Sequence, residues 1–424
     1  MKDSGIDWIG KIPDEWIVSK AKTILHNKTV KNHPNAEVLS LYRDLGVVPK
    51  NSRDDNHNVT SEDTSSYKFV QKGELVLNKM KTWQGSLAVS NYEGIVSPAY
   101  YVCEFINNEI DKNYIHYLLR NKMYAQEFER LSTGLRVGQW DLSIEDFLNT
   151  LIIYPPSKSE QTRIANFLDE KCAQIDSIIE ESKKSIEEYK AWKQSVIFEA
   201  VTGKNLSCKK KNSGIEWISE IPETWEVRAL KTIFRIFSGT TPKSDIIEYW
   251  DGDVNWVTPA DFKTEDVYVE NGKRNISENG FSDCSLELIP INSLIFSKRA
   301  PIGKVCINRN EMCTNQGCLA CVKKINLSIK FFYYLLSSLT EYFEVLGSGT
   351  TFKEISLTSF SDFKVLFPPL SEQESIVKFL DAKCAQIDSL ISEKQSLIQD
   401  LAEYKKSLIF EAVTGKRRPA IKSQ

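Results

Sequence analysis

The sequence predicts an α+β protein in which two mixed α/β domains are joined by two long antiparallel helices that form a coiled coil, with an internal pseudo-twofold repeat. Three observations predict this fold. A motif at residues 5–16 returns at 214–225, a longer segment at 159–204 returns at 371–416, and both longer segments carry apolar residues at a spacing of seven. Self-similarity over such a long interval is typical of a duplicated architecture.

Length and composition agree with a globular protein of more than one domain. The chain has 424 residues, 41% of them hydrophobic and 26% charged, which is enough to form two separate cores. The formal net charge of -3 gives no overall attraction for nucleic acid, so any such contact must come from local basic faces. No signal peptide or membrane span is apparent, and we expect a cytoplasmic protein whose nine cysteines stay reduced.

The two copies of the repeat divide the chain into four predicted parts. Trp8 and Trp217 are 209 residues apart, and Leu168 and Leu380 are 212 residues apart. Between the similar segments lie two much less similar blocks, at about 20–153 and 230–366. The predicted domains are therefore residues 1–155 and 205–367, and the predicted spacer helices are residues 156–204 and, with the C-terminal tail, 368–424.

Each spacer helix has recognisable ends. Prolines precede it at 155–156 and 368–369, and Ser159 or Ser371 is predicted to cap it, with Ser371 and Glu374 forming a capping box. Gly203 and Gly415 are predicted to end it, because glycine suits the left-handed position after a helix.

Two heptad rows are predicted to form the seam between the helices. In the second copy they are Leu380, Ile387, Lys394, Leu401 and Leu408, with the companions Ile376, Lys383, Leu390, Leu397 and Tyr404. In the first copy they are Leu168, Ile175, Ser182, Tyr189 and Val196, with the companions Ile164, Lys171, Ile178, Ser185 and Trp192. A helix of about 40 residues is roughly 60 Å long and could act as a ruler. The alternative is that each helix packs only on its own domain.

The two divergent blocks contain short strands interrupted by Gly, Asn and Pro, and Gly85 aligns with Gly303. A common fold with different loops suits two readers of different DNA half-sites. Base edges are read by Arg, Lys, Asn and Gln, and phosphates are bound by Lys and Arg. The candidate DNA-binding residues are Lys79, Lys81, Gln84, Arg136 and Gln139 in the first block and Lys243, Lys298, Arg299, Asn315, Gln316 and Lys353 in the second. A solvated surface role is the alternative for each one.

Sequence motifs for catalysis or cofactor binding are missing. Cys306, Cys313, Cys318 and Cys321 lie within sixteen residues, and the last pair has the spacing of a zinc site. Their counterparts in the first block are mostly apolar, so we predict core cysteines, with zinc as the alternative. Residues 154–157 share two prolines with the tetrad of amino-methyltransferases but lack its first and last residues. No S-adenosylmethionine loop or phosphate loop is present, so we expect no active site, no metal and no cofactor.

The ordered set of motifs resembles the specificity subunits of type I restriction-modification systems. It comprises the tryptophan openings at 5–16 and 214–225, the Pro-Pro and Glu-Gln helix entrance at 155–161, the Ala-Val-Thr-Gly-Lys helix ends at 200–204 and 412–416, and the run at 256–262. The resemblance extends over the whole chain. It implies two target-recognition domains, each binding one half of a split double-stranded DNA sequence.

The same resemblance implies that the paired helices bind two adenine-specific methyltransferase subunits, which two restriction (motor-nuclease) subunits can then join. The predicted partner contacts are Trp192, Phe198, Tyr404 and Phe410. The chain itself would be non-catalytic. The competing hypotheses are a fused methyltransferase or nuclease with divergent motifs, and a coiled-coil adaptor that does not bind DNA.

Overall fold

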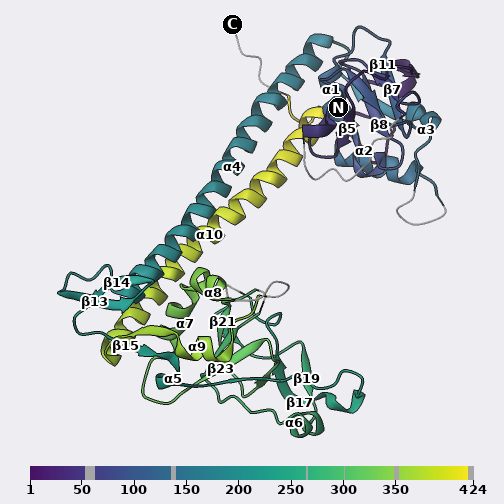
Figure 1. Cartoon of the computed structure of the whole chain (residues 1–424). Coiled ribbons are helices and arrows are strands. Elements are labelled where there is room, and N and C mark those ends of the chain that lie inside the picture. Colours follow the sequence, from purple (N-terminus) through teal and green to yellow (C-terminus); the bar gives the residue numbers. More distant parts are fainter. Residues whose placement is uncertain (53–62, 135–139, 264–265, 300, 348–352, 419–424) are drawn as a thin grey trace. The chain divides into compact units, whose positions relative to one another are not determined.

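The computed structural model describes residues 1–52, 63–134, 140–263, 266–299, 301–347 and 353–418. The chain forms two compact units: unit 1 comprises Met1–Lys183 and Gln395–Gln424, and unit 2 comprises Lys184–Lys394. The boundaries fall inside two long helices, α4 (Lys158–Thr202) and α10 (Leu370–Val413). Each unit therefore contains the beginning of one long helix and the end of the other (Figure 1). The two compact units thus differ from the predicted four successive parts, because each unit combines one block with a part of both long helices.

Unit 1 begins with small strand pairs and then builds a four-stranded antiparallel sheet. Its strands are β1 (Lys2–Asp3), β2 (Lys11–Ile12), β3 (Ile17–Lys20), β4 (Leu25–Lys28), β5 (Leu39–Tyr42), β6 (Gly46–Pro49), β7 (Lys68–Val70), β8 (Leu75–Asn78), β9 (Leu87–Val89), β10 (Gly94–Val96), β11 (Tyr100–Phe105) and β12 (Leu151–Tyr154). Its helices before α4 are η1 (Ala21–Thr23), η2 (Lys50–Ser52), η3 (Thr82–Gln84), α1 (Lys112–Leu119), α2 (Lys122–Leu131) and α3 (Ile144–Asn149).

Unit 2 repeats this order with added strands. Its strands are β13 (Lys210–Ile215), β14 (Ile218–Pro222), β15 (Glu226–Ala229), β16 (Phe234–Ser238), β17 (Trp250–Val257), β18 (Tyr268–Val269), β19 (Arg274–Ile276), β20 (Leu294–Ser297), β21 (Val305–Asn308), β22 (Cys313–Thr314), β23 (Cys318–Lys323) and β24 (Lys364–Phe367). Its helices before α10 are α5 (Leu230–Ile233), η4 (Ile247–Tyr249), α6 (Glu278–Asp283), α7 (Ile329–Ser337), α8 (Thr340–Leu346) and α9 (Leu357–Asp362).

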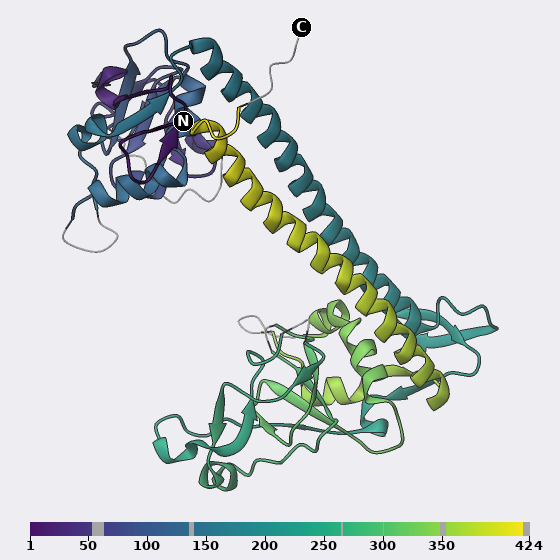
Figure 2. The same cartoon turned by 180° about the vertical axis from the view of Figure 1, so that it is seen from behind.

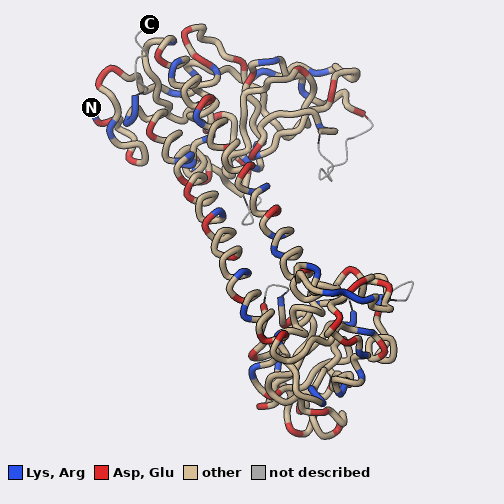
Figure 3. The backbone as a smooth tube through the Cα atoms, turned by 90° about the vertical axis from the view of Figure 1, so that its left-hand side faces the viewer, with Lys and Arg blue, Asp and Glu red and all other residues tan. Residues whose placement is uncertain are grey.

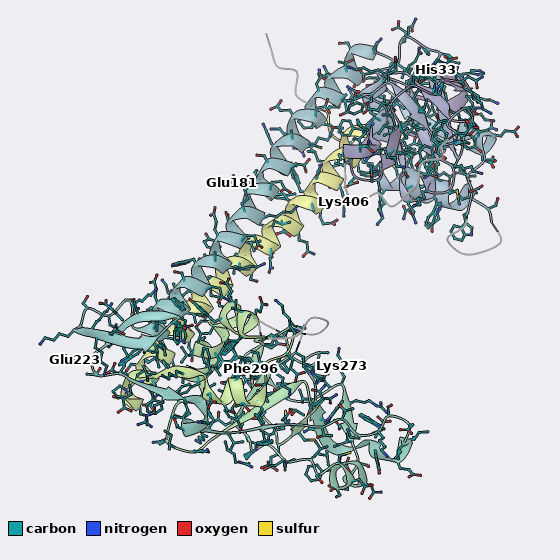
Figure 4. The ribbon with its side chains drawn as sticks, viewed as in Figure 1. His33, Glu181, Glu223, Lys273, Phe296 and Lys406 are labelled. Carbon is teal, nitrogen blue, oxygen red and sulfur yellow. The ribbon has the colours of Figure 1, made fainter. Side chains whose placement is uncertain are left out.

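The sheets confirm that the two divergent blocks share a fold. The strand order is β4-β11-β8-β9 in unit 1 and β16-β23-β20-β21-β18 in unit 2. The pair β3–β12 corresponds to β15–β24, and the hairpin β1–β2 corresponds to β13–β14. Phe296 on β20 is fully buried in the core of unit 2 (Figure 4).

The long helices pack on each other in antiparallel fashion within each unit. In unit 1, Lys405 Nζ lies 2.6 Å from a carboxylate oxygen of Asp176. In unit 2, Lys193 Nζ lies 2.7 Å from Asp388. The two ion pairs are equivalent by the repeat, because Asp176 and Asp388 are 212 residues apart and so are Lys193 and Lys405. Figure 2 shows the helices running side by side, as the fold class predicted.

One of the two predicted heptad rows is confirmed and the other is wrong. Leu168, Leu380 and Leu408 of the first row are at most 1% exposed. The companion row is not buried throughout: exposure is 44% for Ile178, 42% for Trp192, 38% for Leu390, 39% for Leu397 and 47% for Tyr404. The seam instead uses the residues four positions after the first row, namely Cys172, Ile179, Ile186, Lys193 and Ala200 in α4 and Cys384, Ile391, Ile398, Lys405 and Ala412 in α10. Both choices keep a spacing of seven, so periodicity alone could not distinguish them.

The predicted serine caps are also wrong by about half a turn. The helices begin at Lys158 and Leu370, which places Ser159 and Ser371 inside the first turn. The first intrahelical bonds reach the carbonyls of Ser157 and Pro369 at 3.1 and 3.0 Å. The prolines at 155–156 and 368–369 lie just before the first helical residues, Lys158 and Leu370, so they interrupt no hydrogen bond within the helices.

A buried glutamine fixes each helix start to the unit beside it. Gln161 Nε2 donates to the Pro155 carbonyl at 2.8 Å, and its Oε1 accepts from the Asp111 backbone at 2.8 Å. Gln373 makes the equivalent bonds with Pro368 and Ser328 at 2.8 and 2.9 Å. Both glutamines are fully buried. The glutamine of the repeated Glu-Gln motif therefore attaches the start of each long helix to its unit through hydrogen bonds.

The predicted glycine helix ends are confirmed. Gly203 and Gly415 have φ angles of 68° and 71°. Their N–H groups bond to the carbonyls of Ala200 and Ala412 at 3.3 Å, as in a Schellman motif. A Cβ at Gly203 would lie 2.6 Å from Pro222, and one at Gly415 would lie 2.5 Å from Pro13.

We predict that Gly203→Ala and Gly415→Ala each destabilise the protein by more than about 1–2 kcal/mol, which is the cost of the left-handed conformation alone. The loss should be larger because each added methyl also collides with a proline ring. Gly214→Ala is the matched control, since Gly214 has a φ of 71° and open space around it. Urea unfolding measures all three. Equal losses for Gly203→Ala and Gly214→Ala would contradict the close packing.

The described ranges contain no helix with the length and apolar character that crossing a lipid bilayer requires.

Candidate nucleic-acid interface

Several loops that carry candidate residues meet in unit 2. The Lys298 backbone N–H donates to the Gly317 carbonyl at 3.0 Å, and the Ile355 N–H donates to the Lys298 carbonyl at 3.0 Å. The Thr240 N–H donates to the Thr314 carbonyl at 3.0 Å. The loops after β16 and β20, the loop between β22 and β23, and the segment before α9 are therefore neighbours. Candidates that are scattered in the sequence share one region of the unit.

Lys298 and Arg299 share a single acid, Glu354. Lys298 Nζ lies 2.7 Å from Glu354 Oε1, and Arg299 Nε donates to Glu354 Oε2 at 2.8 Å. The Lys298 side chain is 11% exposed, whereas that of Arg299 is 45% exposed. Lys298, and to a smaller degree Arg299, hold the pKa of the Glu354 carboxyl below its ordinary value. Lys298 therefore anchors the loop, and Arg299 is the cation that remains accessible.

Asn315 and Gln316 behave differently although they are adjacent. The Asn315 side chain accepts from the Gly317 N–H at 2.9 Å and so stabilises its own turn. Gln316 is exposed, and its Oε1 accepts from the Thr241 hydroxyl, while its amide nitrogen has no partner among the residues that the structure describes. Lys243 and Lys353 are exposed and have no ionic partner among the described residues.

Unit 1 builds the same scaffold with other side chains. The Lys79 N–H donates to the Ala99 carbonyl at 3.3 Å, and the Leu142 N–H donates to the Lys79 carbonyl at 2.9 Å. Lys79 Nζ lies 3.1 Å from a carboxylate oxygen of Asp141. Lys81 and Gln84 are exposed on and beside η3. The candidates Arg136 and Gln139 lie outside the described residues.

The ion pair Lys79–Asp141 is thus the counterpart of Lys298–Glu354. In both units the acid lies two residues before the serine that caps the next helix, Ser143 or Ser356. Sequence reasoning missed Asp141 and Glu354, although the repeated pattern of an acid, an aliphatic residue and a serine could have revealed them. In the tube view of Figure 3, basic and acidic residues are interspersed on each unit, as expected from the small net charge.

The four predicted partner residues fall into two classes. Trp192 and Tyr404 are 42% and 47% exposed on the flanks of α4 and α10. Phe198 and Phe410 instead pack partly into the cores of their units, each beneath a lysine at 4.8 or 4.4 Å from the ring centre. Phe410 also lines a cavity of about 930 Å³ in unit 1, between α1–α2 and the long helices.

The four clustered cysteines belong to the core, as predicted. All are fully buried, and they are divided among three hydrophobic clusters: Cys321 in one, Cys306 and Cys318 in a second, and Cys313 in a third. Burial raises the pKa of each thiol. In the part of the chain that the structure describes, no three His, Cys, Asp or Glu side chains are grouped so that they could hold a metal ion.

We predict that a thiol reagent labels Cys208 rapidly in the native protein, because Cys208 is exposed. The cysteines of the core should react at least roughly 100-fold more slowly, since burial disfavours the reactive thiolate. Stopped-flow labelling with Cys208→Ser as the control measures this difference. Rapid labelling of several core thiols would show that the core cysteines are accessible.

Comparisons with known proteins identify the family. A family model described as the type I restriction modification DNA specificity domain matches residues 13–188 and 222–399. The chain is 27% identical over 443 residues to the putative type I restriction enzyme MjaX specificity subunit of Methanocaldococcus jannaschii, a match that covers 97% of this chain and 95% of that protein. It is 35% identical over 181 residues to the MjaIX specificity subunit of the same organism, covering 42% of this chain and 41% of that protein.

Two solved structures share the fold. One is a chain from a study of complex assembly and conformational transition of the type I R-M system, with a TM-score of 0.75, 16% identity and coverage of 96% of this chain and 100% of that chain. The other is the HsdS subunit from Thermoanaerobacter tengcongensis, with a TM-score of 0.60, 16% identity and coverage of 96% and 98%. Because the family model matches both halves, the chain belongs to the family of type I restriction-modification DNA specificity subunits.

Proposed function

We propose that this non-catalytic subunit binds a bipartite, asymmetric double-stranded DNA target, with one half read by each unit. The observation that carries the proposal is the shared scaffold of the two units with unlike side chains at equivalent loop positions. The ion pairs Lys79–Asp141 and Lys298–Glu354 are equivalent, but the next residue is Met80 in unit 1 and Arg299 in unit 2. Two copies of one reader with different contact residues suit two different half-sites.

We assign the DNA-facing side to the loops that carry Lys81, Gln84, Lys243, Gln316 and Lys353. The sections of the chain at 1–155 and 205–367 would be the target-recognition domains. Arg136 and Gln139 remain candidates from the sequence. In this assignment Lys79 and Lys298 anchor the loops, and the exposed lysines bind phosphates.

The experiment is a binding titration of the purified subunit, with its methyltransferase partner, on DNA that contains the site methylated in the host. Specific binding should weaken steeply with salt, because phosphate contacts release counterions. The subunit alone should transfer no methyl group. Equal affinity for specific and random DNA in the complex would rule out the proposed recognition.

The partners in this proposal are two adenine methyltransferase subunits, which dock on the long helices, and two restriction subunits that join them. Ile178 and Tyr404 in unit 1 are the repeat counterparts of Leu390 and Trp192 in unit 2, and all four are at least 38% exposed. Each unit therefore offers one exposed aliphatic and one exposed aromatic side chain at equivalent positions on its stretch of the helix pair. A duplicated apolar surface suits a partner bound in two copies. Such a complex would act in the cytoplasm.

We predict that Trp192→Ala and Tyr404→Ala each weaken binding of the methyltransferase subunit, by roughly 30-fold or more if the ring is an interface hot spot of about 2 kcal/mol. Folding should be unaffected, because both rings are exposed. Isothermal titration of methyltransferase into each variant measures the loss, and Ile247→Ala is the control, since Ile247 is 81% exposed and lies on η4. Unchanged stoichiometry and affinity in the double variant would exclude this surface.

A further inference from the structure

Arg299 is held in one orientation by a second residue. Its Nε donates to Glu354 Oε2 at 2.8 Å, and the two residues also face each other across an antiparallel backbone bridge. The terminal nitrogens of the guanidinium have no hydrogen-bond partner among the described residues. Because the guanidinium is planar, fixing Nε at the acid directs the two terminal nitrogens as a pair. Arg299 therefore presents two parallel donors from a fixed position.

The paired donors of Arg299 match the acceptors on the edge of a base. Lys298 and Arg299 both lie within 2.8 Å of the single carboxylate of Glu354, which neutralises one of their two positive charges. The donor geometry is unaffected by this neutralisation. The O6 and N7 atoms of guanine form a pair of acceptors in the major groove that matches two such donors.

Comparison with unit 1 shows that Arg299 differs between the two units, whereas the lysine and the acid beside it are kept. Unit 1 keeps the lysine and the acid as Lys79 and Asp141, but has Met80 at the place of Arg299. Met80 is 45% exposed, which matches the exposure of the Arg299 side chain. The repeat has kept the scaffold and changed the projecting group. This is the pattern expected at a position that determines which base is read.

We propose that Arg299 reads one guanine of the half-site bound by unit 2, through bidentate hydrogen bonds to O6 and N7, and that Glu354 is the positioning residue that orients it. The inference rests on the proposed function and deepens it. Gln316 accepts a hydrogen bond from the Thr241 hydroxyl and is followed by Gly317, whose carbonyl accepts from the Lys298 N–H.

The test uses the complete complex with its methyltransferase and the host-methylated site as the probe. In the wild type, each guanine of the two half-sites is replaced in turn by 7-deazaguanine, which lacks N7. Replacement of one guanine in one half-site should weaken binding, and loss of the Arg299 contact should cost roughly 5- to 150-fold. Arg299→Met, the residue that unit 1 carries, should lose the preference for that guanine and become insensitive to its replacement.

Arg299→Lys separates base reading from phosphate binding. Lysine keeps the charge but has no fork of two donors, so the preference for guanine should fall at that position while binding to the remaining bases is kept. Arg228→Lys is the matched control, because Arg228 Nε donates to Glu226 Oε2 at the same 2.8 Å on β15. If Arg299→Lys keeps the full preference for every guanine, or if no guanine replacement affects the wild type, the proposal is overturned.

Glu354 is tested through its dependence on Arg299. Glu354→Gln should reduce discrimination at the same base pair in the wild-type background and should have no further effect on it in the Arg299→Met background, since a positioning residue acts through its partner. Reduced discrimination at other positions would assign Glu354 a general structural role and overturn its positioning role. A wild-type complex that binds no two-part site would instead contradict the proposed function itself.

Discussion

Insertion of seven residues into α4 alone, between Lys183 and Lys184, is expected to reduce specific DNA binding by roughly 10²- to 10⁴-fold, the gain that simultaneous engagement of two modules provides. Each unit requires both long helices: Lys405 pairs with Asp176 in unit 1, and Lys193 pairs with Asp388 in unit 2. One added heptad lengthens α4 by about 10 Å relative to α10. The ion pair and the packing between α4 and α10 can then no longer form in both units at once, so one unit loses part of its contacts with the long helices.

A matched double insertion provides the control. Adding a heptad to α4 after Lys183 and another to α10 after Lys394 keeps the spacing of seven in both helices and restores both ion pairs. The double variant should bind the same half-sites with a gap longer by about three base pairs, at roughly 3.4 Å each. Selection from a DNA library with random gap lengths measures this change. Full binding of the original site by the single insertion would show that the helices do not set the spacing.

Replacement of Trp225 or Trp16 by alanine is expected to cost about 3–5 kcal/mol in each case, which is a large part of the stability of a domain. Both rings are fully buried, and each contacts the glycine that ends a long helix, with approaches of 3.2 and 3.1 Å to the positions a Cβ would occupy. Their loss would leave a cavity where a helix end meets the first hairpin of a unit. Calorimetry of the variants should show a clear fall in the unfolding temperature.

The phenylalanine variants distinguish the two sites. Trp225 Nε1 donates to Glu372 Oε2 at 2.8 Å, whereas the buried Trp16 Nε1 has no partner in the described part of the chain. Trp225→Phe leaves a carboxylate without its donor, and Trp16→Phe removes a donor that is already unsatisfied. The first substitution should therefore be the more destabilising. A larger loss for Trp16→Phe would contradict this hydrogen-bond pattern.

The sequence predicted the features that local chemistry or duplication determines. Gly203 and Gly415 were correct as helix ends because only glycine readily adopts their φ angles, and the common fold of the two blocks follows from aligned positions such as Gly85 and Gly303, whose φ angles are 85° and 89°. The second heptad row failed because rows three and four residues after the first both recur every seven residues, and packing chooses between them.

The candidate site was only partly predictable for a related reason. A basic residue in a loop is equally suited to binding DNA and to pairing with an acid. Lys298 and Arg299 are adjacent in the sequence, yet one is anchored and the other exposed, because the acid that they share comes from 55 residues further along the chain. Long-range pairs of this kind depend on the sheet that brings the two segments together.

The most direct test of two unlike reading units is the pattern of methylated adenines in a host that carries this subunit and its methyltransferase, compared with a variant whose unit 2 contact residues Arg299 and Gln316 are changed. We expect two specified segments separated by a fixed unspecified gap, with only one segment altered in the variant. A single continuous motif, or changes in both segments at once, would contradict it.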